Sequence, residues 1–405
     1  MNILFVHEVD WLTKVVFEIH NLSEMLSARG HNVYAVDYPD TWFRNGLFDF
    51  GTLKTQRFEG VSRAVEGGKI GLLRPGLIKL PLVSRPSALI THYSEIKKTI
   101  LERDIEVIIL YSAPTNGPQT VRLGRKFNIP VIFRSIDILS RLVRYPALRP
   151  LTRRIERRVY SGADMVLALT PDLARYVADL GAAPKKIRLL PPAVDTSIFR
   201  PGVDTSEVRR KWNLDEQERI VLFMGTFFEF SGLDCFVTRF PEVLSRIPDA
   251  RLLLVGDGPQ RPVLEKLIDR LNLGGKVTIT GFQPYQSMPE YIGTAEICIN
   301  PFLYTDVTRD IIPTKALQYL ACGKPVLATP LPGMVALIPG EREGVVYAAS
   351  PDETIDQTIA LLESDGWRNV LGSNALNYAS LNSYHQMVDN LESILFEAVE
   401  SVGKR

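Results

Sequence analysis

The sequence has few cysteines and no long hydrophobic run. Its three cysteines, Cys235, Cys298 and Cys322, stand far apart among 405 residues. An odd number at these spacings makes neither a disulfide framework nor a zinc pattern. We interpret all three as small buried hydrophobic residues of a cytoplasmic protein. No stretch approaches the roughly 20 apolar residues of a membrane-spanning helix, and the opening MNILFVHEVD lacks the features of a secretion signal, so we expect neither.

Two further absences narrow the function. The formal net charge is only +1, so no overall field attracts nucleic acid. The segment HEVDWLTK, which follows the first predicted strand, contains no glycine. A dinucleotide-binding oxidoreductase would need GxGxxG there, and this class is therefore disfavoured.

The first half alternates between short apolar runs and helical patterns. We expect strands at 3–6, 33–36, 107–110, 130–133 and 165–169, and helices at 15–26, 117–127, 148–160 and 171–180. Strands that are apolar throughout are typical of parallel sheets buried on both faces. Strand, helix and strand at this spacing predict crossover connections. The segment 40–95, rich in Gly, Pro and aromatic residues, cannot be ordered in this way.

The second half repeats the scheme after a proline-rich segment. Residues 185–202 hold three prolines, which predicts a linker and a boundary near 190–205. Strands are expected at 219–224, 251–255, 276–280, 296–299, 325–328 and 344–347, and a final helix at 384–400. The prediction is an α/β protein with two doubly wound Rossmann-like domains, 1–190 and 205–380, which face each other across a ligand-binding cleft. The C-terminal helix, 384–405, can pack back on the first domain.

The stretch 299–333 carries the most chemistry. A strand ends near Asn300, a polar loop follows, and Pro313 suits the first turn of a helix. The candidate residues here are Arg309, Asp310, Thr314, Lys315 and Gln318. A lysine, an arginine and free amides at a helix N-terminus suit a diphosphate. A capped helix with a solvated lysine is an equally good interpretation of the residues alone.

Several segments, taken in order, resemble glycosyltransferase family 4. They are ILFVHE, RRVYSGADMVLALTPDLARYV, LLPPAVDTSIFRP, LLLVGDGP, VTITGF and LQYLACGKPVLAT. The resemblance spans most of the chain except 40–95. It implies the GT-B fold and transfer of a sugar from a nucleotide donor, with retention at the anomeric carbon and no required metal or other cofactor.

This chain departs from the family pattern at the donor site. The family pairs two glutamates separated by seven residues, where this sequence has Asp310 and Gln318. The cations that the family places after the first strand of the second domain are replaced by Thr226 and Ser231, and its histidine by Ile136. The chain is either a divergent member with a rearranged donor site or an inactive partner subunit that kept the fold. A nucleotide-sugar epimerase is a weaker alternative, because 299–333 contains no histidine.

The resemblance also implies a role for each candidate. Glycines at strand ends, Gly225 and Gly256, allow close approach of a ligand. The base of a UDP- or GDP-linked donor would lie against Gly281 and Phe282, and the ribose on Gln318. Arg309, Lys315 and the helix start at Thr314 would neutralise the diphosphate, with Thr226 nearby and Asp310 on the donor sugar.

The first domain is expected to bind the acceptor, a glycan, a glycolipid or a small molecule. His7, which ends the first strand beside Glu8 and Asp10, is the candidate for contact with the acceptor hydroxyl, and a capping role is an equal alternative. His20 lies beside an apolar helical stripe, so we predict a structural histidine.

One helix suggests peripheral contact with the inner face of a membrane. Segment 148–159 has an apolar stripe of Leu148, Leu151, Ile155 and Val159, surrounded by Arg149, Arg153, Arg154, Arg157 and Arg158. A basic amphipathic helix can lie on an anionic lipid surface, and the nearby segment 76–83 adds apolar residues. The alternative is that the stripe packs on the sheet and the arginines are simply solvated.

Overall fold

The computed structural model describes residues 1–13, 16–39, 50–80, 83–143, 145–305, 307–309 and 311–403. The chain divides into two compact units, each with its own sheet. Unit 1 comprises Met1–Pro191 and His385–Arg405, and unit 2 comprises Pro192–Tyr384. Among the described residues, no helix is both long enough and apolar enough to cross a membrane.

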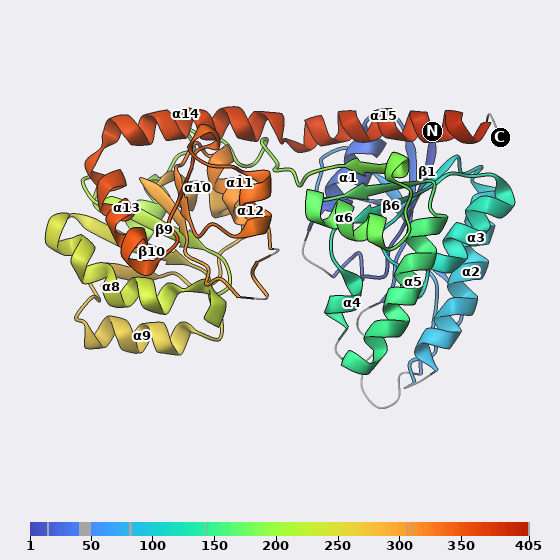
Figure 1. The fold of residues 1–405 in the computed structure, drawn as a ribbon, viewed down its shortest axis with the longest axis horizontal. Coiled ribbons are helices and arrows are strands. Elements are labelled where there is room, and N and C mark those ends of the chain that lie inside the picture. Colours follow the sequence, from blue (N-terminus) through green and yellow to red (C-terminus); the bar gives the residue numbers. More distant parts are fainter. Residues whose placement is uncertain are drawn as a thin grey trace. The chain divides into compact units, whose positions relative to one another are not determined.

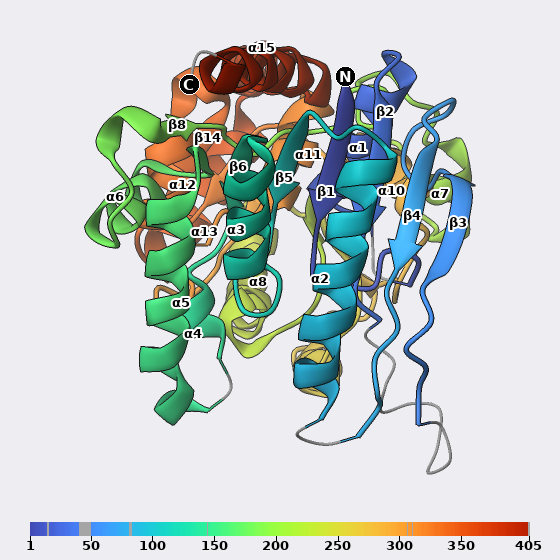
Figure 2. The same ribbon diagram turned by 90° about the vertical axis from the view of Figure 1, so that its right-hand side faces the viewer.

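Unit 1 is a sheet covered by helices (Figures 1 and 2). Its described part has eight strands in the order β3-β4-β2-β1-β5-β6-β7-β8, parallel except for the pair β3 and β4. The strands are β1 Asn2–Val6, β2 Asn32–Val36, β3 Gln56–Val61, β4 Ile70–Arg74, β5 Val107–Leu110, β6 Val131–Ser135, β7 Met165–Ala168 and β8 Ile187–Leu189. The helices are α1 Glu18–Ala28, α2 Ser84–Glu102, α3 Gly117–Phe127, α4 Leu139–Leu142, α5 Arg149–Gly162, α6 Pro171–Asp179 and α15 Tyr384–Gly403.

Unit 2 is built in the same way from six parallel strands in its described part, in the order β11-β10-β9-β12-β13-β14. The strands are β9 Arg219–Met224, β10 Ala250–Val255, β11 Val277–Ile279, β12 Ile297–Asn300, β13 Val326–Ala328 and β14 Val345–Tyr347. The helices are α7 Ser206–Lys211, α8 Leu233–Arg246, α9 Arg261–Arg270, α10 Met288–Gly293, α11 Thr314–Ala321, α12 Pro332–Leu337, α13 Pro351–Glu363 and α14 Asp365–Leu381. These elements confirm two doubly wound α/β units.

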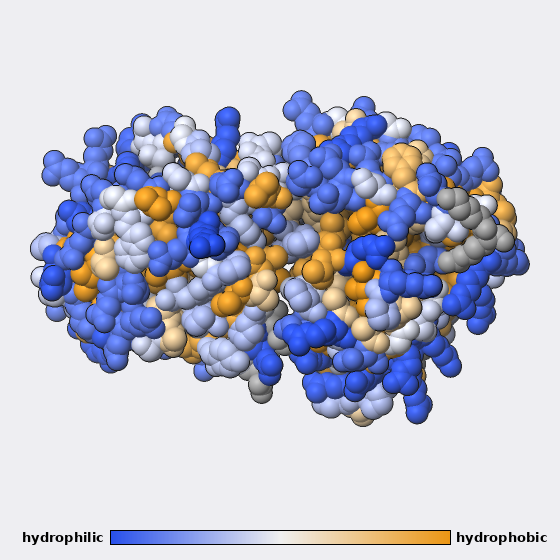
Figure 3. Space-filling view, turned by 45° about the horizontal axis from the view of Figure 1, so that its top comes forward, coloured by the Kyte–Doolittle hydropathy of each residue, from blue (hydrophilic) through white to orange (hydrophobic). Residues whose placement is uncertain are grey.

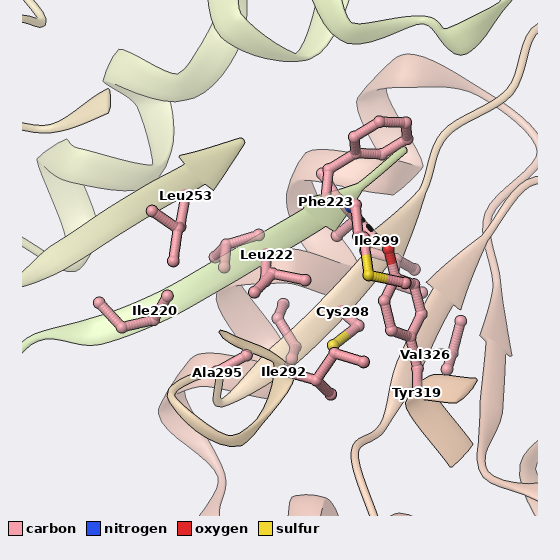
Figure 4. Close-up of a cluster of buried hydrophobic side chains, with 14 of the residues drawn as sticks. Ile220, Leu222, Phe223, Leu253, Ile292, Ala295, Cys298, Ile299, Tyr319 and Val326 are labelled. Carbon is pink, nitrogen blue, oxygen red and sulfur yellow. Dashed lines mark hydrogen bonds between the residues drawn. The ribbon is translucent and has the colours of Figure 1, made fainter. Parts of the chain in front are cut away.

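The core of unit 2 fixes helix α11 against the central strands. Figure 4 shows Leu222 of β9, Cys298 of β12 and Tyr319 of α11 in one buried cluster. The Tyr319 hydroxyl accepts a hydrogen bond of 2.7 Å from the backbone N–H of Met224, the last residue of β9. This bond joins the helix to the carboxyl end of the strand. Cys298 and Cys322 are buried, as predicted, whereas Cys235 is only half-buried.

The predicted linker is partly wrong. Ile187–Leu189 forms strand β8, parallel to β7, because its backbone completes the edge of the first sheet. Val194 and Phe199, which fall after the unit boundary at Pro191, are buried in the core of unit 2. Of the three prolines, Pro192 is buried, Pro191 is half-buried and Pro201 is exposed, so only part of this segment is a solvated spacer.

The face of the molecule shown in Figure 3 is mainly hydrophilic. On this face, blue residues predominate and hydrophobic residues appear between them in small groups. Single exposed hydrophobic residues are ordinary on folded proteins. Only several of them that lie close together call for an explanation.

Candidate functional site

Three glycines lie side by side at the carboxyl edge of the unit 2 sheet. Gly225 follows β9 and its N–H donates to the carbonyl of Val255 at 2.8 Å, while Gly256 follows β10 and bridges to Gly281. Gly256 has a φ of +145°, and a Cβ there would lie 2.0 Å from the carbonyl oxygen of Gly225. Only glycine allows this close approach of the strand ends. The strand ends therefore meet with no side chain between them; Gly256 is buried, and Gly225 and Gly281 are half-buried at this edge.

Lys315 reaches this edge from the first turn of α11. Its Nζ lies 3.9 Å from the ring centroid of Phe223 and 5.0 Å from that of Phe302. A Cβ on Gly225 would be 2.7 Å from the same Nζ, so the amino group lies against the glycine. The side chain is half-buried overall, but its amino end is enclosed, and burial lowers the pKa of Lys315 to about 7. The aromatic faces hold the cation by cation–π attraction.

Gln318 lies one turn further along α11, on the same side of the helix as Lys315. Its amide Nε2 donates to the hydroxyl of Tyr285 at 3.3 Å, and the Tyr285 ring packs edge-on against Phe199 at 5.4 Å. Tyr285 follows the loop of Gly281, so it joins this loop to α11. Tyr285 is not among the residues predicted from the sequence, although an aromatic residue just after the VTITGF segment was a signal for it.

The loop after β9 is held by its own residues. Ser231 is fully buried, and its hydroxyl accepts the N–H of Phe228 at 3.1 Å and donates to the carbonyl of Thr226 at 3.3 Å. The hydroxyl of Ser231 is therefore used to shape the loop, and it does not act as a substitute for a phosphate-binding cation. Thr226 itself is half-buried beside Gly225.

The remaining unit 2 candidates are placed with less detail. Phe282 is 71% exposed directly after Gly281. Thr314 is exposed at the start of α11, and Arg309 is exposed in the preceding turn, where its carbonyl accepts the N–H of Gly333. Asp310 lies outside the described residues, so its contact with the donor sugar stays a prediction.

His7 occupies the carboxyl end of β1 in unit 1, but it is only 7% exposed. Its ring packs on Phe17 and Tyr111 at centroid distances of 5.7 and 5.6 Å. Burial, with a smaller contribution from His20, lowers the pKa of His7 to about 3. The imidazole is thus neutral at pH 7 and can accept a proton only weakly.

The acids that follow His7 have structural partners. Glu8 accepts the backbone N–H groups of Thr115 and Asn116, each at 2.7 Å. Asp10 pairs with Arg74 at 2.8 Å. These carboxylates hold loops at the carboxyl edge of the first sheet, which favours the capping role for this segment.

His20 is structural, as predicted. It is fully buried, and its ring nitrogens contact the carbonyl of Trp11 at 3.1 Å and the N–H of Phe17 at 3.3 Å.

A buried ion pair under the same edge was not predicted. The guanidinium of Arg134, at the end of β6, binds both oxygens of Glu18 at 2.7 and 2.6 Å. Its Nη1 donates to the carbonyl of Leu190 at 2.7 Å, just before the chain leaves unit 1. The pair thus ties together α1, β6 and the end of the unit.

Two family models match the chain. "Glycosyl transferase 4-like domain" matches residues 16–193, and "Glycosyl transferases group 1" matches residues 218–364. The two matches fall in unit 1 and unit 2, respectively, apart from the last two residues of the first match.

Curated relatives match over part of their length. The chain is 26% identical to a D-inositol 3-phosphate glycosyltransferase of Segniliparus rotundus, over 60% of this chain and 54% of that protein. It is 28% identical to a GDP-mannose-dependent alpha-(1-6)-phosphatidylinositol monomannoside mannosyltransferase of Mycobacterium tuberculosis, over 53% and 57%. An alpha-D-kanosaminyltransferase of Streptomyces kanamyceticus is 30% identical over 56% of this chain and 58% of that protein. The chain therefore spans only a little more than half the length of these relatives.

Solved structures share the fold over nearly the whole chain. Sucrose-phosphate synthase from Thermosynechococcus elongatus superposes with a TM-score of 0.70 at 21% identity, covering 99% of each chain. HepE from Anabaena, in complex with UDP and glucose, superposes with a TM-score of 0.69 at 14% identity, covering 98% of this chain and 100% of that one. The two family models together match most of the chain and, with the curated relatives, show that it is a divergent member of glycosyltransferase family 4; the solved structures show the GT-B fold.

Proposed function

We propose that this protein transfers a sugar from a nucleoside-diphosphate sugar to a hydroxyl group of an acceptor. The observation that carries the proposal is the amino group of Lys315, held against the backbone of Gly225 at the carboxyl edge of a parallel sheet. A cation beside close-packed glycines and a helix N-terminus is an arrangement that suits a diphosphate.

The proposed donor lies on unit 2. Its diphosphate contacts Lys315 and the first turn of α11, and the ribose hydroxyls contact Gln318, whose amide already bonds to the Tyr285 hydroxyl. The base lies at Gly281 and the exposed ring of Phe282. UDP and GDP are the preferred nucleotides, because one solved relative holds UDP and one curated relative is named GDP-mannose-dependent.

In the proposed reaction, the bond between the anomeric carbon and the phosphate oxygen breaks. The acceptor oxygen bonds to the same carbon, and its proton passes to the leaving diphosphate. Lys315 and Arg309 stabilise the negative charge that develops on the leaving group. Asp310 holds the donor sugar, and attack occurs on the face that the diphosphate leaves, so that configuration is retained without a metal.

Unit 1 is the proposed acceptor-binding unit, with His7 at the carboxyl edge of its sheet. The acceptor is a glycan, a lipid-linked sugar or a small molecule. The proposed location is the cytoplasm, with peripheral contact to the inner face of the membrane.

A thermal-shift screen of the full chain against UDP, GDP, ADP, TDP, CMP and their sugar conjugates tests the proposal. A ligand that binds only the folded state raises Tm as its concentration exceeds Kd. We expect a shift with one nucleoside diphosphate and turnover of its sugar conjugate that is lost in Asp310→Ala. Binding without turnover would favour the inactive partner subunit, and no shift with any nucleotide would contradict the proposed donor site.

A further inference from the structure

The end of α4, the segment after it and the first turn of α5 expose four large apolar side chains in unit 1. Leu142, Tyr145, Leu148 and Leu151 are 66%, 62%, 48% and 56% exposed. The sequence placed Leu148 and Leu151 on one stripe with Ile155 and Val159, but the structure divides this stripe. Val159 is buried and Ile155 is half-buried against the sheet, whereas the first turn of α5 extends beyond the core. We call residues 141–143 and 145–158 the α4–α5 tip.

Five arginines of α5 belong to the same tip. They are Arg149, Arg153, Arg154, Arg157 and Arg158, and all are exposed. In the part of the chain that the structure describes, none of the five forms an ion pair with an acidic side chain. Glu156, the acid within α5, is fully buried and accepts hydrogen bonds from the hydroxyls of Tyr160 and Tyr176. The outward charge of this helix is therefore not neutralised by its own acid.

The α4–α5 tip lies at the carboxyl edge of the sheet. The helices follow parallel strands and run back against them, so α5 starts where β6 and its neighbours end. Figures 1 and 2 both show the N-terminal ends of α2 and α5 at the end of unit 1 that is opposite to α15. Leu80 and Val83, just before α2, are also exposed at this end, 38% and 40%.

We propose that the α4–α5 tip docks on an anionic lipid surface, with Leu142, Leu148 and Leu151 in the interface and the arginines on the headgroups. Charge complementarity identifies the partner as anionic, and the exposed aliphatic side chains favour a lipid surface over nucleic acid. Aliphatic side chains gain free energy by entering the acyl boundary, whereas nucleic acid offers them no comparable environment. The proposal gives the membrane contact its surface and does not depend on sugar transfer.

Co-sedimentation of the full chain with vesicles tests this proposal. The vesicles contain phosphatidylcholine alone or phosphatidylcholine with 30% phosphatidylglycerol (about a third anionic lipid). We expect binding to the anionic vesicles only, and weaker binding as salt rises. Each arginine near such a surface raises the partition coefficient onto anionic vesicles about fivefold. The double variant Arg154→Glu/Arg158→Glu should therefore lower this coefficient about thirtyfold or more.

Two matched controls come from unit 2. Arg210→Glu/Arg342→Glu makes the same charge change at exposed arginines, and it should leave binding within about twofold of the unmodified chain. Leu148→Ser/Leu151→Ser should weaken binding about tenfold or more, whereas Val263→Ser/Val370→Ser, at residues 44% and 59% exposed, should not.

Three results would overturn the proposal. The first is equal binding of the unmodified chain to both vesicle types. The second is a loss of vesicle binding in the unit 2 control variants as large as that in the α4–α5 tip variants. The third is vesicle binding that the leucine substitutions leave unchanged, together with equally tight binding to duplex DNA. Because vesicle binding is measured without a donor or acceptor, a failure here leaves the proposed sugar transfer untouched. Conversely, an inactive protein that binds anionic vesicles would still support this surface.

Discussion

Lys315 combines a positive charge with surroundings that disfavour it. The ordinary pKa of 10.5 applies in the unfolded chain, whereas burial lowers the pKa to about 7 in the folded one. The aromatic rings of Phe223 and Phe302 compensate only in part. A lysine kept in such a place at a cost in stability fits a residue that is used when an anion arrives.

This cost predicts a pH-dependent stability. Between pH 7 and 10.5 the unfolded state binds the extra proton, so the free energy of unfolding rises with pH, by up to about 1.4 kcal/mol per pH unit. Lys315→Met should remove this slope and leave the protein at least as stable at pH 7. Urea unfolding at pH 7 and pH 9 measures both.

The matched control is Lys266→Met, which removes an exposed lysine of α9 and should keep the slope of the unmodified chain. If Lys315→Met and Lys266→Met gave the same slope, the amino group of Lys315 would not be titrating in this range.

Substitution of Gly256 is expected to lower the stability of unit 2. Alanine would place its Cβ 2.0 Å from the carbonyl oxygen of Gly225, at a φ of +145°. Backbone must shift to relieve this contact, and we expect a loss of roughly 3 kcal/mol in unfolding free energy. Gly274→Ala, where no atom lies within 4 Å of the added Cβ, should change stability little. Thermal unfolding of the two variants checks this, and similar Tm values would contradict the crowded strand ends.

Among secondary-structure elements, those with buried apolar runs could be predicted from the sequence. Strands β5 and β7 are buried along their whole length. Each is therefore a continuous apolar run in the sequence, which indicates a buried strand. The amphipathic pattern of 117–127 predicts helix α3 at its observed bounds, Gly117–Phe127. In the structure, Asn128 takes a left-handed conformation and ends the helix.

Elements with weak patterns were missed for physical reasons. Strand β3 is an antiparallel edge strand whose residues are all at least partly exposed, so it has no continuous apolar run. Strand β8 is three residues long beside prolines, and its pairing with β7 is set by the sheet, not by its own sequence. Within the candidate site, the glycines could be found from strand ends. The cage of Phe223 and Phe302 around Lys315 could not, because it depends on three elements.

The Arg134–Glu18 pair predicts coupling between elements. Arg134→Met leaves the Glu18 carboxylate, which is 13% exposed, without its bidentate partner. We expect a loss of about 3–5 kcal/mol in unfolding free energy, most of which the double variant Arg134→Met/Glu18→Gln should recover. Denaturant unfolding of the single and double variants gives the coupling. Additive losses would show that the two residues act independently.

For the molecule as a whole, each unit presents a carboxyl sheet edge with different chemistry. In unit 2 the edge is lined by glycines and by one enclosed lysine. In unit 1 it carries a neutral histidine and carboxylates that hold loops, with the α4–α5 tip at the same end. This difference supports the proposed division into a donor-binding and an acceptor-binding unit.

The central claim is that the unit 2 edge binds a nucleoside diphosphate through Lys315. Calorimetric titration of UDP and GDP into the full chain at pH 6.5 and 8.5 tests it most directly, with Lys315→Met and Lys266→Met alongside. A diphosphate favours the charged lysine, so we predict weaker binding at pH 8.5. We further predict at least a tenfold loss in Lys315→Met at pH 6.5 and a smaller loss at pH 8.5, where the lysine of the unmodified chain is largely neutral. Equal affinity in Lys315→Met and the unmodified chain at both pH values would contradict the account.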